Sequence, residues 1–99
     1  MRFFFRIWVR EGSEGEYRER HRAVWPELIG ELSRAGVRNY SIFMRGNEVF
    51  GYWECDDLQS TLEYLSRSSV NRRWQEHMGD IIVRRDDFPG NYDEVFHMD

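Results

Sequence analysis

The chain has 99 residues, 32% of them charged, and a formal net charge of −4 at pH 7. A chain of this length is expected to fold as one domain, here residues 1–99. The acidic balance argues against nucleic acid or an anionic membrane as a partner, because both attract basic surfaces. All 14 Lys and Arg residues are arginine, which excludes Schiff-base chemistry on a lysine.

The cellular location is inferred from the apolar runs and the cysteine count. No apolar run approaches the roughly 20 residues that span a bilayer. Arg6 and Arg10 interrupt the N-terminal apolar segment, which is therefore unlike a signal peptide. Cys55 is the single cysteine, so no internal disulfide can form. We expect a cytoplasmic protein.

The first part of the chain predicts a strand followed by a helix. Aromatic and β-branched residues alternate over 3–10, which is typical of a strand. Ser13 and Glu16 have the spacing of a capping box, and an apolar stripe at helical spacing follows them. Pro26 is predicted to kink or split this helix just before it, and Gly36 to end it.

The rest of the chain predicts a hairpin, two helices and a last strand. The hairpin is indicated by two alternating segments that flank turn residues. In chain order the predicted elements are a strand at 37–44, a turn at 45–48, a strand at 49–55, a helix capped by Asp56 or Asp57 and broken at 67–69, a helix from Val70 ended by Gly79, a loop at 86–91 and a strand at 92–98.

The order strand, helix, strand, strand, helix, strand predicts an α+β fold. Two split βαβ units give a ferredoxin-like, four-stranded antiparallel sheet with its helices on one face. The other face would carry large side chains such as Phe4 and Trp8. Because an exposed apolar face needs covering, we expect a homodimer packed sheet against sheet, with a ligand cavity between or beside the sheets.

Few residues are candidates for chemistry. The histidines His21, His77 and His97 do not have the spacing of common metal motifs, so no metal site is predicted. No nucleophile elbow, dinucleotide loop or phosphate loop is present in the sequence. Cys55 is followed by two aspartates, which disfavour its thiolate. Acid–base chemistry remains.

Tyr17 and His21 are four residues apart on the apolar stripe of the first predicted helix, so their side chains are neighbours. Histidine moves protons near neutral pH. On spacing alone, however, a buried histidine bonded to a carbonyl is the favoured interpretation. Trp74 is likewise more typical of a core residue than of a surface on which a sugar packs.

A resemblance changes this balance. The run Tyr17-Arg18-Glu19-Arg20-His21-Arg22-Ala23-Val24-Trp25-Pro26-Glu27-Leu28 resembles the YxxRHxxxWPEL signature of the L-rhamnose mutarotase family. The segments at 39–43, 50–54, 73–80 and 94–98 continue the similarity, in order, over essentially the whole chain.

The resemblance implies a dimeric α+β barrel that interconverts the α and β anomers of a deoxy sugar without a cofactor. It implies an acid–base role for His21 and sugar contacts for Tyr17, Tyr40 and Trp74. Gln75 stands where many members have a second tryptophan, and we predict that it hydrogen-bonds to the sugar.

Several alternatives stay open at this point. His77 is a rival proton carrier. The sugar could be L-fucose, because several segments also resemble relatives assigned to that sugar. Other classes are a non-catalytic sugar-binding or regulatory module, and a cofactor-free or haem-linked oxygenase on the same fold.

Overall fold

The computed structural model describes residues 1–83 and 92–99. Their strands form one antiparallel sheet in the order β2-β3-β1-β4. The strands are β1 (Arg2–Val9), β2 (Arg38–Arg45), β3 (Glu48–Glu54) and β4 (Ile82–Val83). In the centre of the sheet, Phe5 of β1 and Ile42 of β2 both lie opposite Gly51 of β3.

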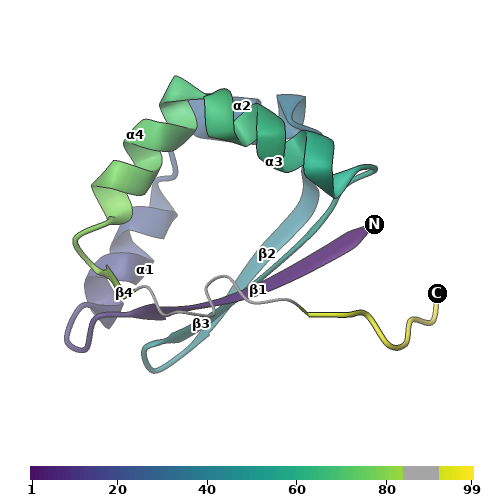
Figure 1. The fold of residues 1–99 in the computed structure, drawn as a ribbon. Helices are drawn as coiled ribbons and strands as arrows, with labels where there is room; N and C mark the ends of the chain where they lie inside the picture. Colours follow the sequence, from purple (N-terminus) through teal and green to yellow (C-terminus); the bar gives the residue numbers. More distant parts are fainter. Residues whose placement is uncertain (84–91) are drawn as a thin grey trace.

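The helices cover one face of this sheet (Figure 1). They are α1 (Glu14–Arg22), α2 (Pro26–Arg34), α3 (Leu58–Arg67) and α4 (Ser69–Met78). The element order, the strand order and the one-sided helices confirm the predicted ferredoxin-like α+β fold, with each predicted helical stretch present as a pair of helices.

The predicted breaks between the helices are also confirmed. Pro26 stands in the first turn of α2, and Trp25 before it is extended, as expected of a residue that precedes proline. Gly36 follows α2 with φ +94°, a conformation that costs glycine little. Asp57 caps α3 by accepting from the amides of Gln59 and Ser60.

The capping box predicted at Ser13 is wrong, although α1 does begin next to it. The Ser13 side chain makes no capping hydrogen bond. Its backbone lies at φ −104° and ψ 10°, outside the extended region that aims a capping hydroxyl at the helix amides. Instead the Glu14 carboxylate accepts from the Gly12 amide at 2.9 Å.

The predicted strand at 92–98 is wrong as well. The fourth strand is Ile82–Val83, which pairs with the free side of β1 directly after α4. Residues 92–98 form no strand; instead, Tyr92 packs on Phe4 with ring centroids 5.0 Å apart. Val95 is 93% exposed. The predicted loop at 86–91 lies outside the described residues.

The core lies between the sheet and the helices, where Val9, Val49 and Met78 are almost fully buried. Cys55 is also fully buried, in agreement with a structural role. Within the described residues, no helix is long and apolar enough to cross a membrane.

The opposite face of the sheet carries aromatic side chains, as predicted from strand alternation. Phe4 packs on Phe50 with ring centroids 5.7 Å apart, and the Arg6 guanidinium lies 4.5 Å from the Trp8 ring centroid. Phe43 is 64% exposed. An apolar surface therefore remains on the side of the sheet away from the helices.

Candidate active site

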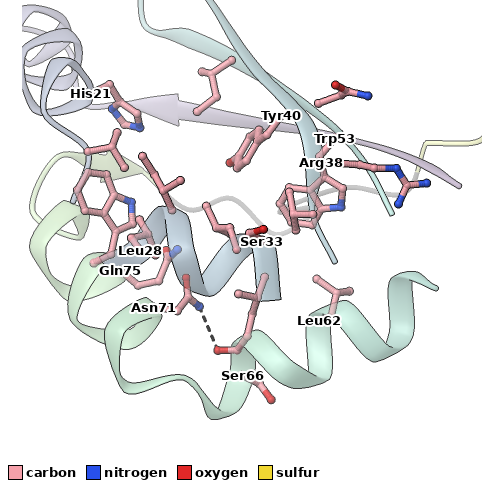
Figure 2. A pocket seen from close by; sticks show the side chains of 18 residues that line it. His21, Leu28, Ser33, Arg38, Tyr40, Trp53, Leu62, Ser66, Asn71 and Gln75 are labelled. Atoms are coloured by element: carbon pink, nitrogen blue, oxygen red, sulfur yellow. Dashed lines mark hydrogen bonds between the residues drawn. The ribbon is translucent and has the colours of Figure 1, made fainter. Parts of the chain in front are cut away.

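A cavity lies between the sheet and the helices, and it has two adjoining parts. The part that we call the inner chamber has a volume of about 220 Å³ and reaches Phe5 and Ile7 of β1. The part that we call the outer hollow has a volume of about 640 Å³ and extends to Arg38 and Ser66 (Figure 2). Both are lined by His21, Tyr40, Ile42, Trp53, Leu62, Trp74 and Gln75.

The structure brings all the predicted site residues together. Tyr17, His21, Tyr40, Trp74 and Gln75 line the inner chamber. They come from α1, β2 and α4, so residues far apart in the sequence meet at one place. The rival histidine, His77, lines neither part of the cavity, although its ring lies 5.6 Å from that of Trp74.

His21 is half-buried at the end of α1, and its hydrogen bond defines its chemistry. Its Nδ1 lies 3.0 Å from the Tyr17 carbonyl oxygen. A carbonyl only accepts, so Nδ1 donates and Nε2 carries the lone pair. Burial lowers the pKa of His21 below its ordinary 6.5, although the Tyr17 carbonyl opposes this effect. The ring is therefore neutral at pH 7 and able to accept a proton.

Two aromatic rings hold the imidazole in place. Tyr17 stacks on it with ring centroids 4.3 Å apart and planes at 27°. Trp74 meets it edge-on at 5.5 Å. Both aromatic residues are nearly buried, at 4% and 7% exposure, and belong to the core. The structural interpretation from the sequence is thus correct for these rings, which also form walls of the inner chamber.

The two phenols of the site are protonated at neutral pH. Burial raises the pKa of Tyr17 to about 12. Tyr40 is 37% exposed as a residue, but its hydroxyl end points into the cavity (Figure 2). Burial there raises the pKa of Tyr40, and the charge that Tyr17 would carry on ionisation raises it further. Both groups are hydrogen-bond donors rather than bases.

Several lining residues were missed in the sequence. Trp53 and Phe5 line the inner chamber from β3 and β1. The alternation that predicted the strands could have placed both residues on the face of the sheet that the helices cover. Each lies an even number of positions along the strand from a buried residue, and such residues point to the same face. Leu62 on α3 has the helical spacing of Leu58 and Leu65 in the sequence, but such spacing does not distinguish a cavity wall from a core position, and Leu62 is 44% exposed.

An ion pair next to the site fixes α1 against the end of α4. The Arg20 guanidinium donates to both Asp80 carboxylate oxygens, at 2.9 and 3.2 Å, and to the His77 carbonyl at 2.6 Å. It holds the pKa of the Asp80 carboxyl below its usual value. Arg20 immediately precedes His21, so this contact positions the helix turn that carries the imidazole.

Among residues 1–83 and 92–99 there is no group of three or more His, Cys, Asp or Glu side chains placed to hold a metal ion. A histidine with a free lone pair, two phenols, an amide and tryptophan rings line one small chamber, an arrangement that can exchange a proton with a bound polar molecule. Together with the ferredoxin-like sheet, these features are typical of α+β proteins that bind a small molecule beside the sheet.

Comparisons identify the family. A family model described as L-rhamnose mutarotase matches residues 2–98. The chain belongs to this family and is therefore an isomerase that acts on a carbohydrate by interconverting its anomers. This membership confirms the resemblance drawn from the run between Tyr17 and Leu28.

Individual relatives agree with the family model. The chain is 42% identical to an L-rhamnose mutarotase from Opitutus terrae, with 92% of this chain and 91% of the relative covered. It is 35% identical to one from Pectobacterium atrosepticum, with 100% and 99% covered.

Two solved structures are also similar. The crystal structure of an L-rhamnose mutarotase from Formosa agariphila is 29% identical, with a TM-score of 0.81 over 100% of this chain and 99% of that one. Tetracenomycin F2 cyclase from Streptomyces glaucescens shares the fold, with a TM-score of 0.60 at 17% identity over 99% and 95%.

Proposed function

We propose that this chain interconverts the α and β anomers of L-rhamnose by proton transfer through His21. The observation that carries the proposal is the His21 imidazole in the inner chamber, whose Nδ1 lies 3.0 Å from the Tyr17 carbonyl oxygen, so that the lone pair is left on Nε2. The relatives named above support L-rhamnose as the sugar.

The proposed reaction opens and recloses the pyranose ring. His21 Nε2 takes the proton of the anomeric hydroxyl while the bond between C1 and the ring oxygen breaks, which gives an aldehyde. The imidazolium returns the proton to the former ring oxygen, so no proton is gained or lost. After rotation about C1–C2, the same steps in reverse close the ring on the other face. Positioned proton transfer of this kind contributes about 10²–10⁴-fold in rate.

The other site residues have binding roles in this proposal. The phenols of Tyr17 and Tyr40 donate hydrogen bonds to sugar oxygens, and one of them stabilises the negative charge that develops on the ring oxygen. Trp74 packs against the C–H face of the ring, and the Gln75 amide both donates and accepts. These groups all belong to the chain itself.

Saturation-transfer NMR between the anomeric protons tests the proposal. With L-rhamnose we expect magnetisation transfer that appears only when the enzyme is present. L-Fucose and D-glucose are measured in parallel. Greater magnetisation transfer with L-fucose than with L-rhamnose would identify L-fucose as the substrate. Sugar binding without any magnetisation transfer would favour a non-catalytic sugar-binding module.

The pH dependence of the same exchange follows from the lowered pKa of His21. The neutral imidazole is the active form, and it predominates above its pKa. The kcat/KM for L-rhamnose should therefore be highest above the lowered pKa of His21 and fall at more acidic pH, with a midpoint below 6.5. A midpoint above 6.5 would contradict the assignment of a desolvated His21 as the base.

We also propose a homodimer formed through the aromatic face of the sheet. The support is Phe43, 64% exposed beside Phe50 and Phe4 on the face that lacks helices. Phe43→Arg would bury unpaired charge in such an interface, so we expect a dimer by light scattering in the native protein and a monomer in the variant. Ile29→Arg, at an apolar position on α2 that is 56% exposed, is the matched control and should remain dimeric.

We also propose that the enzyme is cytoplasmic. The support is the single cysteine, Cys55, which is free and buried, since disulfides mark proteins of oxidising compartments.

A further inference from the structure

The outer hollow is larger than the proposed sugar requires. A deoxyhexose has eleven non-hydrogen atoms, and a water molecule in the liquid occupies about 30 Å³, so the sugar fills less than roughly 330 Å³. The inner chamber, with the predicted site residues, already provides about 220 Å³ of this. Most of the 640 Å³ of the outer hollow is therefore left over when the sugar is in place.

The walls of the outer hollow are largely aliphatic. The residues that line it but not the inner chamber include six aliphatic side chains: Val24, Leu28, Ile29, Leu32, Val37 and Leu65. Such walls offer no hydrogen bonds, so a ligand gains binding free energy from them only when its own apolar surface is buried against them.

Several polar groups at the edge of the hollow already have partners within the chain. Arg38 pairs with Asp56 at 3.0 Å. The Asn71 amide donates to the Leu65 carbonyl at 3.2 Å (Figure 2), and the Ser66 hydroxyl donates to the Glu63 carbonyl at 2.7 Å. A second sugar unit would need many hydrogen bonds here, whereas an alkyl chain needs none.

The outer hollow borders the inner chamber along its whole length. The residues that line both parts run from His21 at one end, past Tyr40, to Trp53 and Leu62 toward the other (Figure 2). In a pyranose, C4 is opposite C1, so a sugar with C1 at His21 places its C4 hydroxyl at the Leu62 end. There Val37 and Leu65, which belong to one apolar cluster with Trp53, line the outer hollow.

We propose that the outer hollow binds an apolar group attached to O4 of the sugar, so that the enzyme also accepts reducing 6-deoxyhexoses that are O-alkylated or O-acylated at this position. This inference rests on the proposed function, because that function places C1 at His21. The chemical class of the additional ligand is an aliphatic ether or ester of the same sugar.

A series of ethers tests the inference. The kcat/KM for anomer exchange is measured with L-rhamnose and with its 4-O-methyl, 4-O-propyl and 4-O-(2-hydroxyethyl) ethers. A fully buried methylene is worth about fourfold, so the two extra methylenes of the 4-O-propyl ether, buried in part, should raise its kcat/KM over that of the 4-O-methyl ether by about tenfold. The 4-O-(2-hydroxyethyl) ether is the matched control, because it has the same length and ends in a hydroxyl that the aliphatic wall cannot bond. It should show no such gain.

Two variants locate the effect. Ser66→Trp fills the outer hollow, and Ile29→Glu places a charge in its wall. Both positions are exposed and lie outside the inner chamber, so exchange of L-rhamnose should be unchanged in both variants while the tenfold preference for the propyl ether is lost. A preference that survives in both variants, or a rate that falls as the 4-O-alkyl group lengthens, would overturn the inference.

Binding alone separates this inference from the proposed function. Quenching of tryptophan fluorescence reports binding of the ethers without any turnover, since Trp53 and Trp74 line the cavity. Tighter binding of the 4-O-propyl ether without exchange of L-rhamnose would refute the proposed function and retain the site. Exchange of L-rhamnose without tighter binding of that ether would refute the site alone.

Discussion

Replacement of His21 by glutamine is expected to lower kcat/KM for L-rhamnose exchange by about 10²–10⁴-fold, the usual contribution of a positioned acid–base group. Glutamine retains polar atoms near the Tyr17 carbonyl but does not exchange a proton near neutral pH. The measurement is saturation transfer between the anomeric protons, with circular dichroism to verify the fold.

His77→Gln is the matched control for this prediction. His77 is exposed and lines neither the inner chamber nor the outer hollow, so its variant should keep nearly full activity. The proposal assigns the wrong histidine if His77→Gln is inactive and His21→Gln is not. Tyr17→Phe should reduce the rate less than His21→Gln, because it removes one hydrogen-bond donor and leaves the stacked ring in place.

The positions of His21 and Tyr17 illustrate what the sequence can predict. Their four-residue spacing on an apolar stripe correctly placed them side by side and facing inward. Spacing favoured a histidine bonded to a carbonyl, and the structure contains that bond. The bond and a role in proton transfer are compatible, because the carbonyl engages Nδ1 and leaves the lone pair on Nε2.

The fourth strand shows where sequence reasoning failed. Residues 92–98 include Tyr92, Val95 and Phe96, which favour a strand, but a strand also needs a free sheet edge. Ile82 and Val83 follow α4 directly and pair with β1. This pairing needs a shorter connection than pairing by residues 92–98 would, so it costs less loop-closure entropy. A two-residue strand gives almost no periodic signal, so it could not be recognised in the sequence.

The ion pair between Arg20 and Asp80 was unpredictable for a different reason. The two residues are 60 positions apart, and each looks like an ordinary surface charge in the sequence. Only the packing of α1 against the end of α4 brings them together. The cavity volumes likewise depend on how the helices pack over the sheet, which no local pattern encodes.

Gly51→Ala is expected to destabilise the fold and weaken sugar binding together. A Cβ at position 51 would lie 2.1–2.7 Å from three ring carbons of Phe5, which faces Gly51 across the sheet. Phe5 cannot move freely, because Trp53 and Tyr40 pack on it at 6.0 and 6.3 Å between ring centroids. Overpacking of this kind costs about 1–3 kcal/mol of unfolding free energy, and the displaced ring intrudes on the inner chamber.

Denaturant unfolding and the KM for L-rhamnose measure the two effects of Gly51→Ala. Gly15→Ala is the matched control, since a Cβ there meets nothing within 4 Å and alanine favours a helix such as α1. Its stability should be equal to or slightly greater than that of the native protein.

The double variant Gly51→Ala/Phe5→Leu isolates the cause. If the added methyl group acts through the Phe5 ring, the shorter leucine gives it room, and Gly51→Ala should cost less in the Phe5→Leu background than in the native protein. Equal costs in the two backgrounds would mean that Gly51 is required for another reason. In that case the contact of the Phe5 ring with Gly51 would not be what leaves room in the inner chamber for the sugar.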